Sequence, residues 1–256
     1  MLQFRPLAKA LPPNWQMTGL LYPVFAGGPN NCTSITELAA RMRAPLDACD
    51  GPIVIVGYSI GGTFAYQIAT ELRARGKEVA VVCIDTRLRT LLRKRGRLAR
   101  GFRNLLYRKP RRLLNRLRAW HRPAPPPLPD WSPDDPDLKT FVTGCRESVR
   151  RYHPARSDVP VVMIRAQAHR DWRHWIDDKY WPSPTHGWSR VAPVAGIIPG
   201  PGDHLSIINP EHVDALAKSL DQALALALAC LAAPQQGRRR YKRRRFWTSV
   251  RAEPPA

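Results

Sequence analysis

A serine flanked by glycines, placed directly after an apolar run, is the feature that most constrains how this chain folds. Residues 53–56 are all apolar, the pentad Gly-Tyr-Ser-Ile-Gly follows at 57–61, and a helix-patterned stretch comes next. A strand that enters a helix through one tight turn forces the central turn residue into a strained backbone conformation. Flanking glycines remove the Cβ atoms that would clash there. The pentad therefore predicts a nucleophile elbow centred on Ser59.

This elbow predicts chemistry as well as fold. It lifts the Oγ atom of Ser59 clear of the sheet, and it points the backbone N–H of Ile60 toward the same space as half of an oxyanion hole. A serine between glycines is also compatible with a phosphate-binding turn, which stays open as an alternative. The strand, turn and helix context favours a serine hydrolase or acyltransferase.

The residues after the elbow predict a β-α-β unit. Residues 61–75 carry apolar side chains on one stripe, and Gly76 supplies a helix stop. Residues 79–84 form a second continuous apolar run, which ends at Asp85. Apolar runs without polar alternation are typical of parallel strands buried on both faces. The predicted fold class is α/β, with a doubly wound, mostly parallel sheet.

Further elements are expected on both sides of this unit. The pattern predicts helices at 4–11, at 37–42 behind capping residues 33–36, at 137–152, and from Pro210 to about residue 229 behind Asn209 as N-cap. It predicts strands at 17–22, 159–165 and 197–198.

The net charge of +21 is concentrated in two stretches. Residues 87–122 hold fifteen Arg or Lys residues and no acidic residue, and residues 238–256 hold eight basic residues and one glutamate. Of 41 basic and 20 acidic residues in the chain, 18 basic and 19 acidic ones remain elsewhere. The body is therefore close to neutral, and the excess charge says little about the function of the core.

Cysteine usage and hydropathy indicate the compartment. The five cysteines are scattered and show no spacing typical of a metal site or a disulfide framework, so we interpret them as reduced thiols. No continuous apolar stretch reaches the roughly 18–20 residues of a membrane span, and the N-terminus lacks a long apolar signal core. The sequence predicts a soluble, cytoplasmic protein without a membrane partner.

A serine nucleophile needs a base, and the base needs a group that orients it. Asp85 ends the strand after the elbow helix, and His204 lies in a Gly-Asp-His turn after the last predicted strand. The chain order Ser59, Asp85, His204 is the order used by α/β-hydrolases. Asp203 could also orient His204, but neighbouring side chains in a turn usually diverge, so Asp85 is the preferred acid.

Several motifs together resemble the thioesterase domains of nonribosomal peptide and polyketide synthetases, over roughly residues 3–229. The resemblance rests on the elbow, on Gly187-Trp188-Ser189, and on the following stretches: 5–11, 34–39, 65–69, 84–86 and 202–206. It implies an α/β-hydrolase fold with a helical lid insertion, here at about 87–152, and a domain that spans 1–233. Residues 234–256 are expected to form a basic disordered tail.

The resemblance also implies an activity. It predicts a thioesterase that releases or edits an acyl or peptidyl chain held as a phosphopantetheine thioester on a carrier protein, through a serine acyl-enzyme. Ser59, Asp85 and His204 would be the triad and Ile60 an oxyanion donor. The carrier protein and its thioester would be the partners, with no cofactor or metal of the enzyme's own.

One departure from the family pattern concerns the oxyanion hole. Family members carry an opening strand and a glycine-containing loop ahead of the helix that begins near Phe4, and that loop supplies the second oxyanion donor. The chain is expected to lack both, unless Ala26-Gly27-Gly28 serves instead. Losing one donor typically costs about 10²–10³-fold in turnover. The alternative function is therefore a truncated, impaired family member that acts as a carrier-protein binding module.

The basic stretch 87–122 allows two interpretations. It lies where the family inserts its lid, so its cations could attract an acidic carrier protein. Alternatively, its arginines merely face solvent. Basic helices also bind nucleic acid non-specifically, but no recognised DNA- or RNA-binding motif accompanies this stretch, and no specific nucleic-acid partner is expected.

Overall fold

The structure is a computed structural model, and it describes residues 4–22, 34–88, 136–168 and 184–233. Most of the basic stretch 87–122, the segment 26–28 and the tail 234–256 lie outside these residues. The elements in chain order are α1 Arg5–Ala10, α2 Ile35–Asp47, β1 Ile53–Tyr58, α3 Ile60–Ala74, β2 Val79–Ile84, α5 Pro136–Arg151, β3 Val161–Ala166, η4 Trp188–Arg190, β4 Val194–Gly200, η5 Pro210–His212 and α6 Val213–Ala232.

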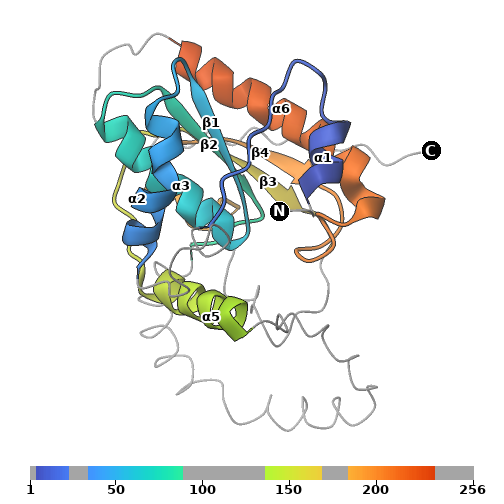
Figure 1. The fold of residues 1–256 in the computed structure, drawn as a ribbon. Coiled ribbons are helices and arrows are strands. Elements are labelled where there is room, and N and C mark those ends of the chain that lie inside the picture. The colour runs from blue at the N-terminus through green and yellow to red at the C-terminus, as the bar shows by residue number, and fades with distance from the viewer. Residues whose placement is uncertain (1–3, 23–33, 89–135, 169–183, 234–256) are drawn as a thin grey trace, which may run out of the picture.

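The described strands form a four-stranded parallel sheet in the order β1-β2-β3-β4 (Figure 1). In this sheet β1 and β2 are in register from Ile53 opposite Val79 to Tyr58 opposite Ile84. The carboxyl ends of parallel strands meet at one edge of a sheet. The residues that follow β1 and β2 are therefore neighbours, which is the relation predicted for Ser59 and Asp85.

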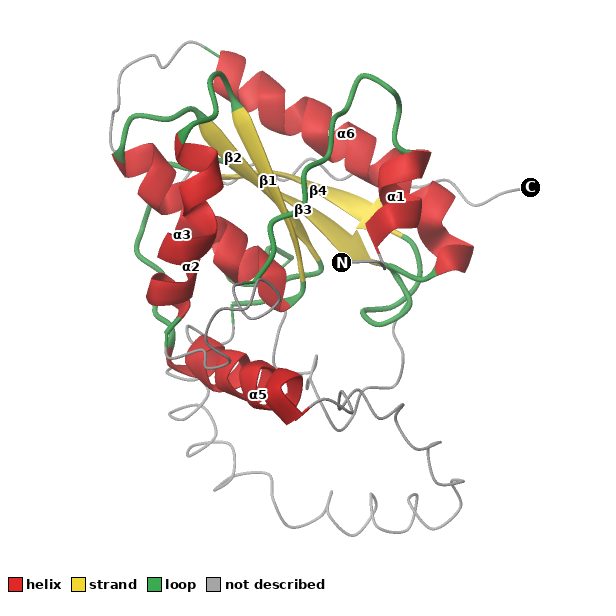
Figure 2. Cartoon of the chain, in the orientation of Figure 1, coloured by secondary structure: helices red, strands yellow, loops and turns green. Residues whose placement is uncertain are grey.

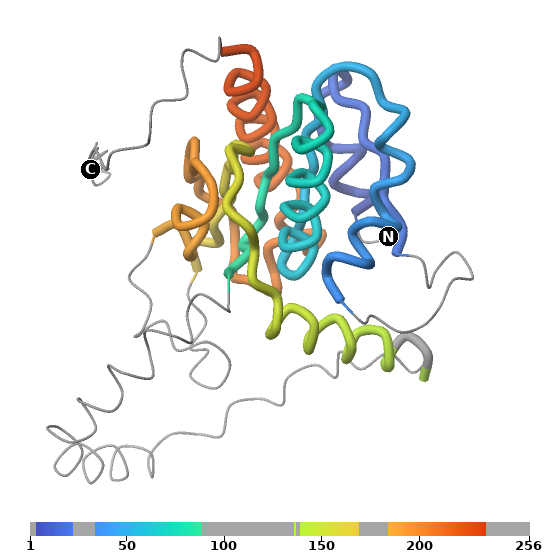
Figure 3. The backbone as a smooth tube through the Cα atoms, turned by 90° about the vertical axis from the view of Figure 1, so that its left-hand side faces the viewer, coloured from blue at the N-terminus to red at the C-terminus, as the bar shows by residue number. Residues whose placement is uncertain are grey.

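Two helical layers cover the sheet, one on each face (Figure 2). Alternate residues of the buried strand β2 divide between the layers: Val81 belongs to the core cluster that also holds residues of α2, α3 and α5, whereas Val82 belongs to the cluster with residues of α1 and α6. All six β2 residues are buried. This explains the apolar run without alternation, because each strand face has its own helical cover. Figure 3 shows α5 beyond the ends of the strands rather than alongside them.

Two helix ends follow the predicted local chemistry. Ser34 caps α2, because its side chain accepts a hydrogen bond from the Glu37 N–H at 3.0 Å. After α3, Gly76 has a φ of +84°, which is the left-handed conformation expected of a helix stop. The predicted helices at 4–11, 61–75 and 137–152 and the strands at 53–56, 79–84 and 159–165 are confirmed to within a few residues.

Three predicted elements differ from the structure. Residues 17–22 form no strand with the described residues, although Leu20 and Tyr22 pack against the core. The last strand, β4, is longer than the predicted pair 197–198; its partly buried positions alternate with exposed ones, so the apolar pair reveals only part of it. The final helix opens as the 3₁₀ turn η5, and the Asn209 side chain bonds Glu211 Oε1 at 3.1 Å instead of capping backbone.

Among the described residues, the final helix is the one helix long and apolar enough to cross a membrane. Residues Pro210–Ala232 are long enough, with a mean hydropathy of 1.5. Six residues of α6 are nevertheless buried, among them Leu216 and Leu220, and they belong to the cluster formed with β2 and β3. Packing against the sheet accounts for the apolar residues on the buried face of this helix.

Candidate active site

Ser59 lies in the strained turn that the pentad predicts. Its φ of +52° and ψ of −120° are unusual for a residue with a side chain, and α3 begins at the next residue. A Cβ on Gly57 would collide with the backbone of Gly61 and Gly62, so this position requires glycine. A Cβ on Gly61 would meet nothing within 4 Å, so the steric need expected of the second flanking glycine is wrong. The Ser59 N–H donates to the Ile84 carbonyl at 2.9 Å, which fastens the elbow to β2.

Asp85 occupies an equally constrained position at the end of β2. Its φ is +42°, it is only 2% exposed, and its N–H donates to the Ile164 carbonyl of β3 at 2.8 Å. Strain of this kind persists only where surrounding structure enforces it. Hydrogen bonding of β2 to its neighbours β1 and β3 supplies that enforcement.

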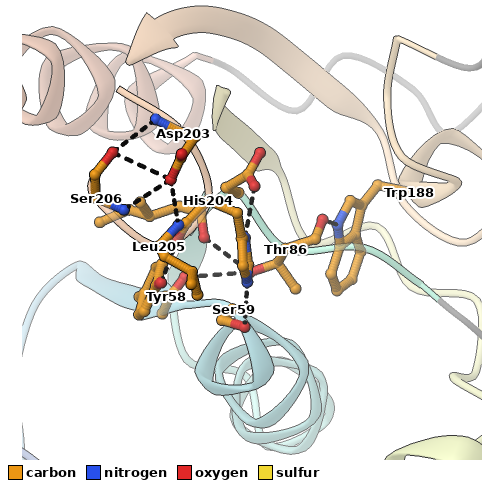
Figure 4. Close-up of polar contacts among 11 residues, drawn as sticks. Tyr58, Ser59, Thr86, Trp188, Asp203, His204, Leu205 and Ser206 are labelled. Carbon is orange, nitrogen blue, oxygen red and sulfur yellow. Dashed lines mark hydrogen bonds and ion pairs between the residues drawn. The ribbon is translucent and has the colours of Figure 1, made fainter. Parts of the chain in front are cut away.

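His204 lies in a turn that Asp203 organises. One oxygen of Asp203, Oδ1, accepts hydrogen bonds from the Leu205 N–H at 2.9 Å, the Ser206 N–H at 3.0 Å and the Ser206 hydroxyl at 3.1 Å. Ser206 Oγ accepts in return from the Asp203 N–H at 2.9 Å (Figure 4). Asp203 therefore stabilises the turn itself rather than orienting the imidazole, in agreement with the sequence preference for Asp85.

The three predicted residues come together although 145 positions separate the first from the last. His204 Nε2 lies 3.0 Å from Ser59 Oγ, and His204 Nδ1 lies 2.6 Å from Asp85 Oδ2 (Figure 4). A proton on Nδ1, donated to the carboxylate, leaves Nε2 as an acceptor for the serine hydroxyl. This arrangement can activate a serine hydroxyl as a nucleophile.

The electrostatics of Asp85 favour the ionised carboxylate. Burial alone raises the pKa of Asp85, but the hydrogen bond from His204 and the positive charges of His204, His186 and Arg87 together lower this pKa below its ordinary value. A buried carboxylate that stays ionised can stabilise an imidazolium formed on His204. The His204 side chain is 23% exposed, so one side of the ring remains open to a substrate.

Residues behind Asp85 tie the elbow to the acid. The Thr86 hydroxyl donates toward the carbonyls of Ile84 at 3.3 Å and of Gly57 at 3.4 Å, and the Thr86 side chain fills the space that a Cβ on Gly62 would need. The indole Nε1 of Trp188, which is fully buried, donates to the Thr86 carbonyl at 2.9 Å. The sequence shows Thr86 and Trp188 only as parts of motifs. It does not reveal the contact between them, because 102 positions separate the two residues.

Ile60, the predicted oxyanion donor, opens the helix that follows the nucleophile. Ile60 is the first residue of α3, and the first N–H groups of a helix have no acceptor within it. The Ile60 N–H thus starts at the positive end of the helix dipole, directly after Ser59. The other candidate donors, Ala26-Gly27-Gly28, lie outside the described residues.

The fold and the site together define a class. A parallel sheet covered by helices on both faces, with a serine elbow after one strand and an acid and a histidine after later strands, is α/β-hydrolase-like. The family model for the thioesterase domain matches residues 1–224. The chain therefore belongs to the thioesterase domain family, a family of hydrolases that act on thioesters.

Part of the chain is similar in sequence to two curated synthase proteins. A stretch of 87 residues is 39% identical to enterobactin synthase component F from Escherichia coli O157:H7, and it covers 33% of this chain but 7% of that protein. The matched part is thus a small fraction of the length of the curated relatives. The strain K12 protein matches at 38% identity over the same length.

Two solved structures show the same fold. The thioesterase domain of NocB, in covalent complex with a fluorophosphonate nocardicin G analogue, is 23% identical with a TM-score of 0.56, covering 87% of this chain and 88% of that one. ClbQ, from the colibactin NRPS/PKS pathway, is 13% identical with a TM-score of 0.56, covering 90% and 93%. At these identities the likeness establishes the fold alone.

Proposed function

We propose that this domain is a serine thioesterase that removes an acyl or peptidyl chain from a carrier-protein phosphopantetheine thioester in nonribosomal peptide or polyketide biosynthesis. The observation that carries the proposal is the chain of contacts from Ser59 through His204 to Asp85, at 3.0 Å and 2.6 Å. Membership of the thioesterase domain family supports the thioester as the bond attacked.

In the first half of the reaction, Ser59 Oγ attacks the thioester carbonyl carbon while His204 Nε2 takes the hydroxyl proton. The Ile60 N–H stabilises the oxyanion, and collapse of the tetrahedral intermediate expels the pantetheine thiolate, which takes the proton from His204. Ionised Asp85 stabilises the imidazolium in between. The products are a free thiol and an ester of Ser59.

In the second half, water or a nucleophile within the bound chain attacks this ester. His204 again takes the proton and returns it to Ser59 Oγ, which leaves as the free hydroxyl. Water yields an acid, whereas an internal nucleophile yields a ring. Both outcomes use the same three side chains.

A carrier protein as donor is the part of the proposal that extends furthest from the site. Enterobactin synthase component F supports it. Its name marks it as a component of a synthase, and the matched stretch makes up only 7% of its length. The thioester arm, rather than the carrier surface, would reach Ser59. Small pantetheine thioesters can therefore test the chemistry without the carrier.

The test combines product release with intact-protein mass spectrometry. Wild-type protein is mixed with acyl-pantetheine or acyl-N-acetylcysteamine thioesters, and thiol release is followed with a chromogenic reagent. The mass of the protein is measured in rapidly quenched samples. We expect thiol release and an acyl adduct on Ser59 in the wild type, and neither with Ser59→Ala.

Ser34→Ala is the matched serine control, because Ser34 caps α2 and takes no part in the triad. It should release thiol at the wild-type rate per folded molecule. Equal thiol release by wild type and Ser59→Ala would refute the acyl-enzyme. A wild type that binds an acyl-loaded carrier protein but releases no thiol would instead favour the binding-module alternative.

A further inference from the structure

The tyrosine that precedes the nucleophile contacts the base. The Tyr58 hydroxyl donates a hydrogen bond to the backbone carbonyl of His204, and the two rings lie with centroids 5.5 Å apart and planes inclined by 30° (Figure 4). One contact restrains the backbone of His204, and the other covers a side of its imidazole. Both come from a residue that is adjacent to Ser59 in the chain.

These contacts answer a geometric problem in the sheet. His204 follows β4, whereas Ser59 follows β1, and β2 and β3 lie between them. At about 4.8 Å per strand, the two strand ends are roughly 14 Å apart. The histidine turn must therefore reach back across the carboxyl edge of the sheet, although Gly200 at the end of β4 and the Ala168 N–H, which donates to the Gly202 carbonyl at 2.8 Å, join it only to the β3 and β4 side of the sheet.

The contact with Asp85 does not by itself fix this turn. It restrains the far end of the imidazole, while Asp203 hydrogen-bonds within the turn. Neither interaction determines how far the His204 backbone stands from β1. The Tyr58 hydroxyl joins that backbone directly to the strand that carries the nucleophile.

The Tyr58 hydroxyl is suited to act as a lasting donor. Its burial, and then the negative charges of Asp85 and Asp203, raise the pKa of Tyr58 well above its ordinary value. The phenol therefore stays protonated at neutral pH and can donate a hydrogen bond. A neutral donor to a backbone carbonyl also adds no charge that would compete with Asp85 for the imidazolium.

We infer that Tyr58 is a positioning residue for the proposed reaction, which holds the His204 turn at the distance from Ser59 that proton transfer requires. Tyr58 does not contact substrate in this role, and it exchanges no proton. The inference rests on the proposed function for its kinetic consequence, but the restraint on His204 is a property of the folded protein whether or not it turns over.

The direct test is Tyr58→Phe, which keeps the ring beside His204 and removes only the hydroxyl. A displacement of about 1 Å between reacting groups can cost 10²-fold in rate. We therefore expect kcat for an acyl-N-acetylcysteamine thioester to fall by about 10- to 100-fold while KM changes by less than about 2-fold. Phosphonylation of Ser59 by a fluorophosphonate should slow by a similar factor.

Tyr152→Phe is the matched control. It removes another partly buried tyrosine hydroxyl, whose hydrogen bond goes to Gln67 Oε1 at 2.6 Å, away from the triad. Both variants should lose similar stability in thermal unfolding, but Tyr152→Phe should keep the wild-type kcat. Equal kcat in Tyr58→Phe and wild type, or equal losses in the two variants, would overturn the positioning role.

A second readout needs no turnover. The proton shared between His204 Nδ1 and Asp85 gives a downfield proton NMR resonance, which Asp85→Asn identifies by its loss. Tyr58→Phe should speed its exchange with solvent relative to wild type and Tyr152→Phe. An unchanged exchange rate in Tyr58→Phe would contradict the inference, even if the wild type hydrolysed no thioester. Faster exchange in Tyr58→Phe together with an inactive wild type would count against the proposed function alone.

Discussion

The site has two halves that are held in different ways. Ser59 and Asp85 follow adjacent strands of the sheet, both have positive φ, and each donates its N–H to a carbonyl of the next strand. His204 instead lies on a turn after β4, whose described neighbour is β3 alone and whose partly buried residues alternate with exposed ones. Side-chain hydrogen bonds from Tyr58 and within Asp203–Ser206 hold that turn, together with the Ala168 N–H, which donates to the Gly202 carbonyl, and the buried Ile207 side chain.

The positions of the three side chains are therefore fixed by two different kinds of interaction. The nucleophile and the acid inherit their positions from buried backbone, so only changes that disturb the core should move them. The base depends on a few polar contacts near the surface, so conservative changes there should alter activity more than stability.

The largest effect should come from Asp85→Asn. The amide keeps the volume of the side chain, but it cannot stabilise the imidazolium and it favours the wrong tautomer of His204. Loss of the acid in a serine triad costs about 10⁴-fold in kcat. Steady-state thiol release from an acyl-N-acetylcysteamine thioester measures this, with Asp203→Asn as the matched carboxylate control. A smaller loss of kcat in Asp85→Asn than in Asp203→Asn would show that Asp203, and not Asp85, orients His204.

The same carboxylate predicts how stability depends on pH. Since the pKa of Asp85 is lowered in the folded state, the unfolded chain, with an ordinary pKa of about 3.9, binds the proton more readily. Ionised Asp85 therefore contributes its full stabilisation above about pH 4, and this is lost as the pH falls through the lower, folded-state value. Urea unfolding between pH 6 and pH 3 should show a steeper loss for wild type than for Asp85→Asn.

A pair of glycine substitutions tests the backbone-held half. A Cβ on Gly62 would overlap the buried Thr86 side chain, whereas a Cβ on Gly61 would meet nothing within 4 Å. We expect Gly62→Ala to lower the free energy of unfolding by about 3 kcal/mol through overpacking. Gly61→Ala should raise it by about 0.5–1 kcal/mol, because alanine is the better helix former. Similar values for the two variants would show that Thr86 does not lock the elbow to the acid loop.

The hydrogen-bonded half is tested by removing the organiser of the histidine turn. Asp203→Ala leaves the N–H groups of Leu205 and Ser206 without their acceptor, which should cost about 1–2 kcal/mol of stability and reduce kcat about 10-fold. Asp203→Asn keeps an oxygen at the same place and should recover most of both. Denaturant unfolding and thiol release measured on the same samples separate the two effects. An Asp203→Ala variant with wild-type kcat would show that the turn tolerates the loss.

The sequence predicted the backbone-held half well, because its determinants are local. Glycines around Ser59, an apolar run before it and an aspartate at the end of the next run all lie between residues 53 and 85. The contacts of Tyr58, Thr86 and Trp188 were not predictable, since each joins segments whose approach only the tertiary fold determines. The strand predicted at 17–22 was wrong for a related reason: apolar residues there pack against the core without a described strand beside them.

The smallest expected effect concerns two predicted helix caps, one correct and one not. Ser34 accepts from the Glu37 N–H, so Ser34→Ala should lower the free energy of unfolding by about 1 kcal/mol. Asn209 makes no side-chain cap, and its exposed hydrogen bond to Glu211 should be worth a few tenths of a kcal/mol at most. Both changes lie outside the triad contacts, and kcat should stay at the wild-type value in each. Urea unfolding at neutral pH resolves the difference, and a larger loss for Asn209→Ala would mean that this helix start depends on the side chain after all.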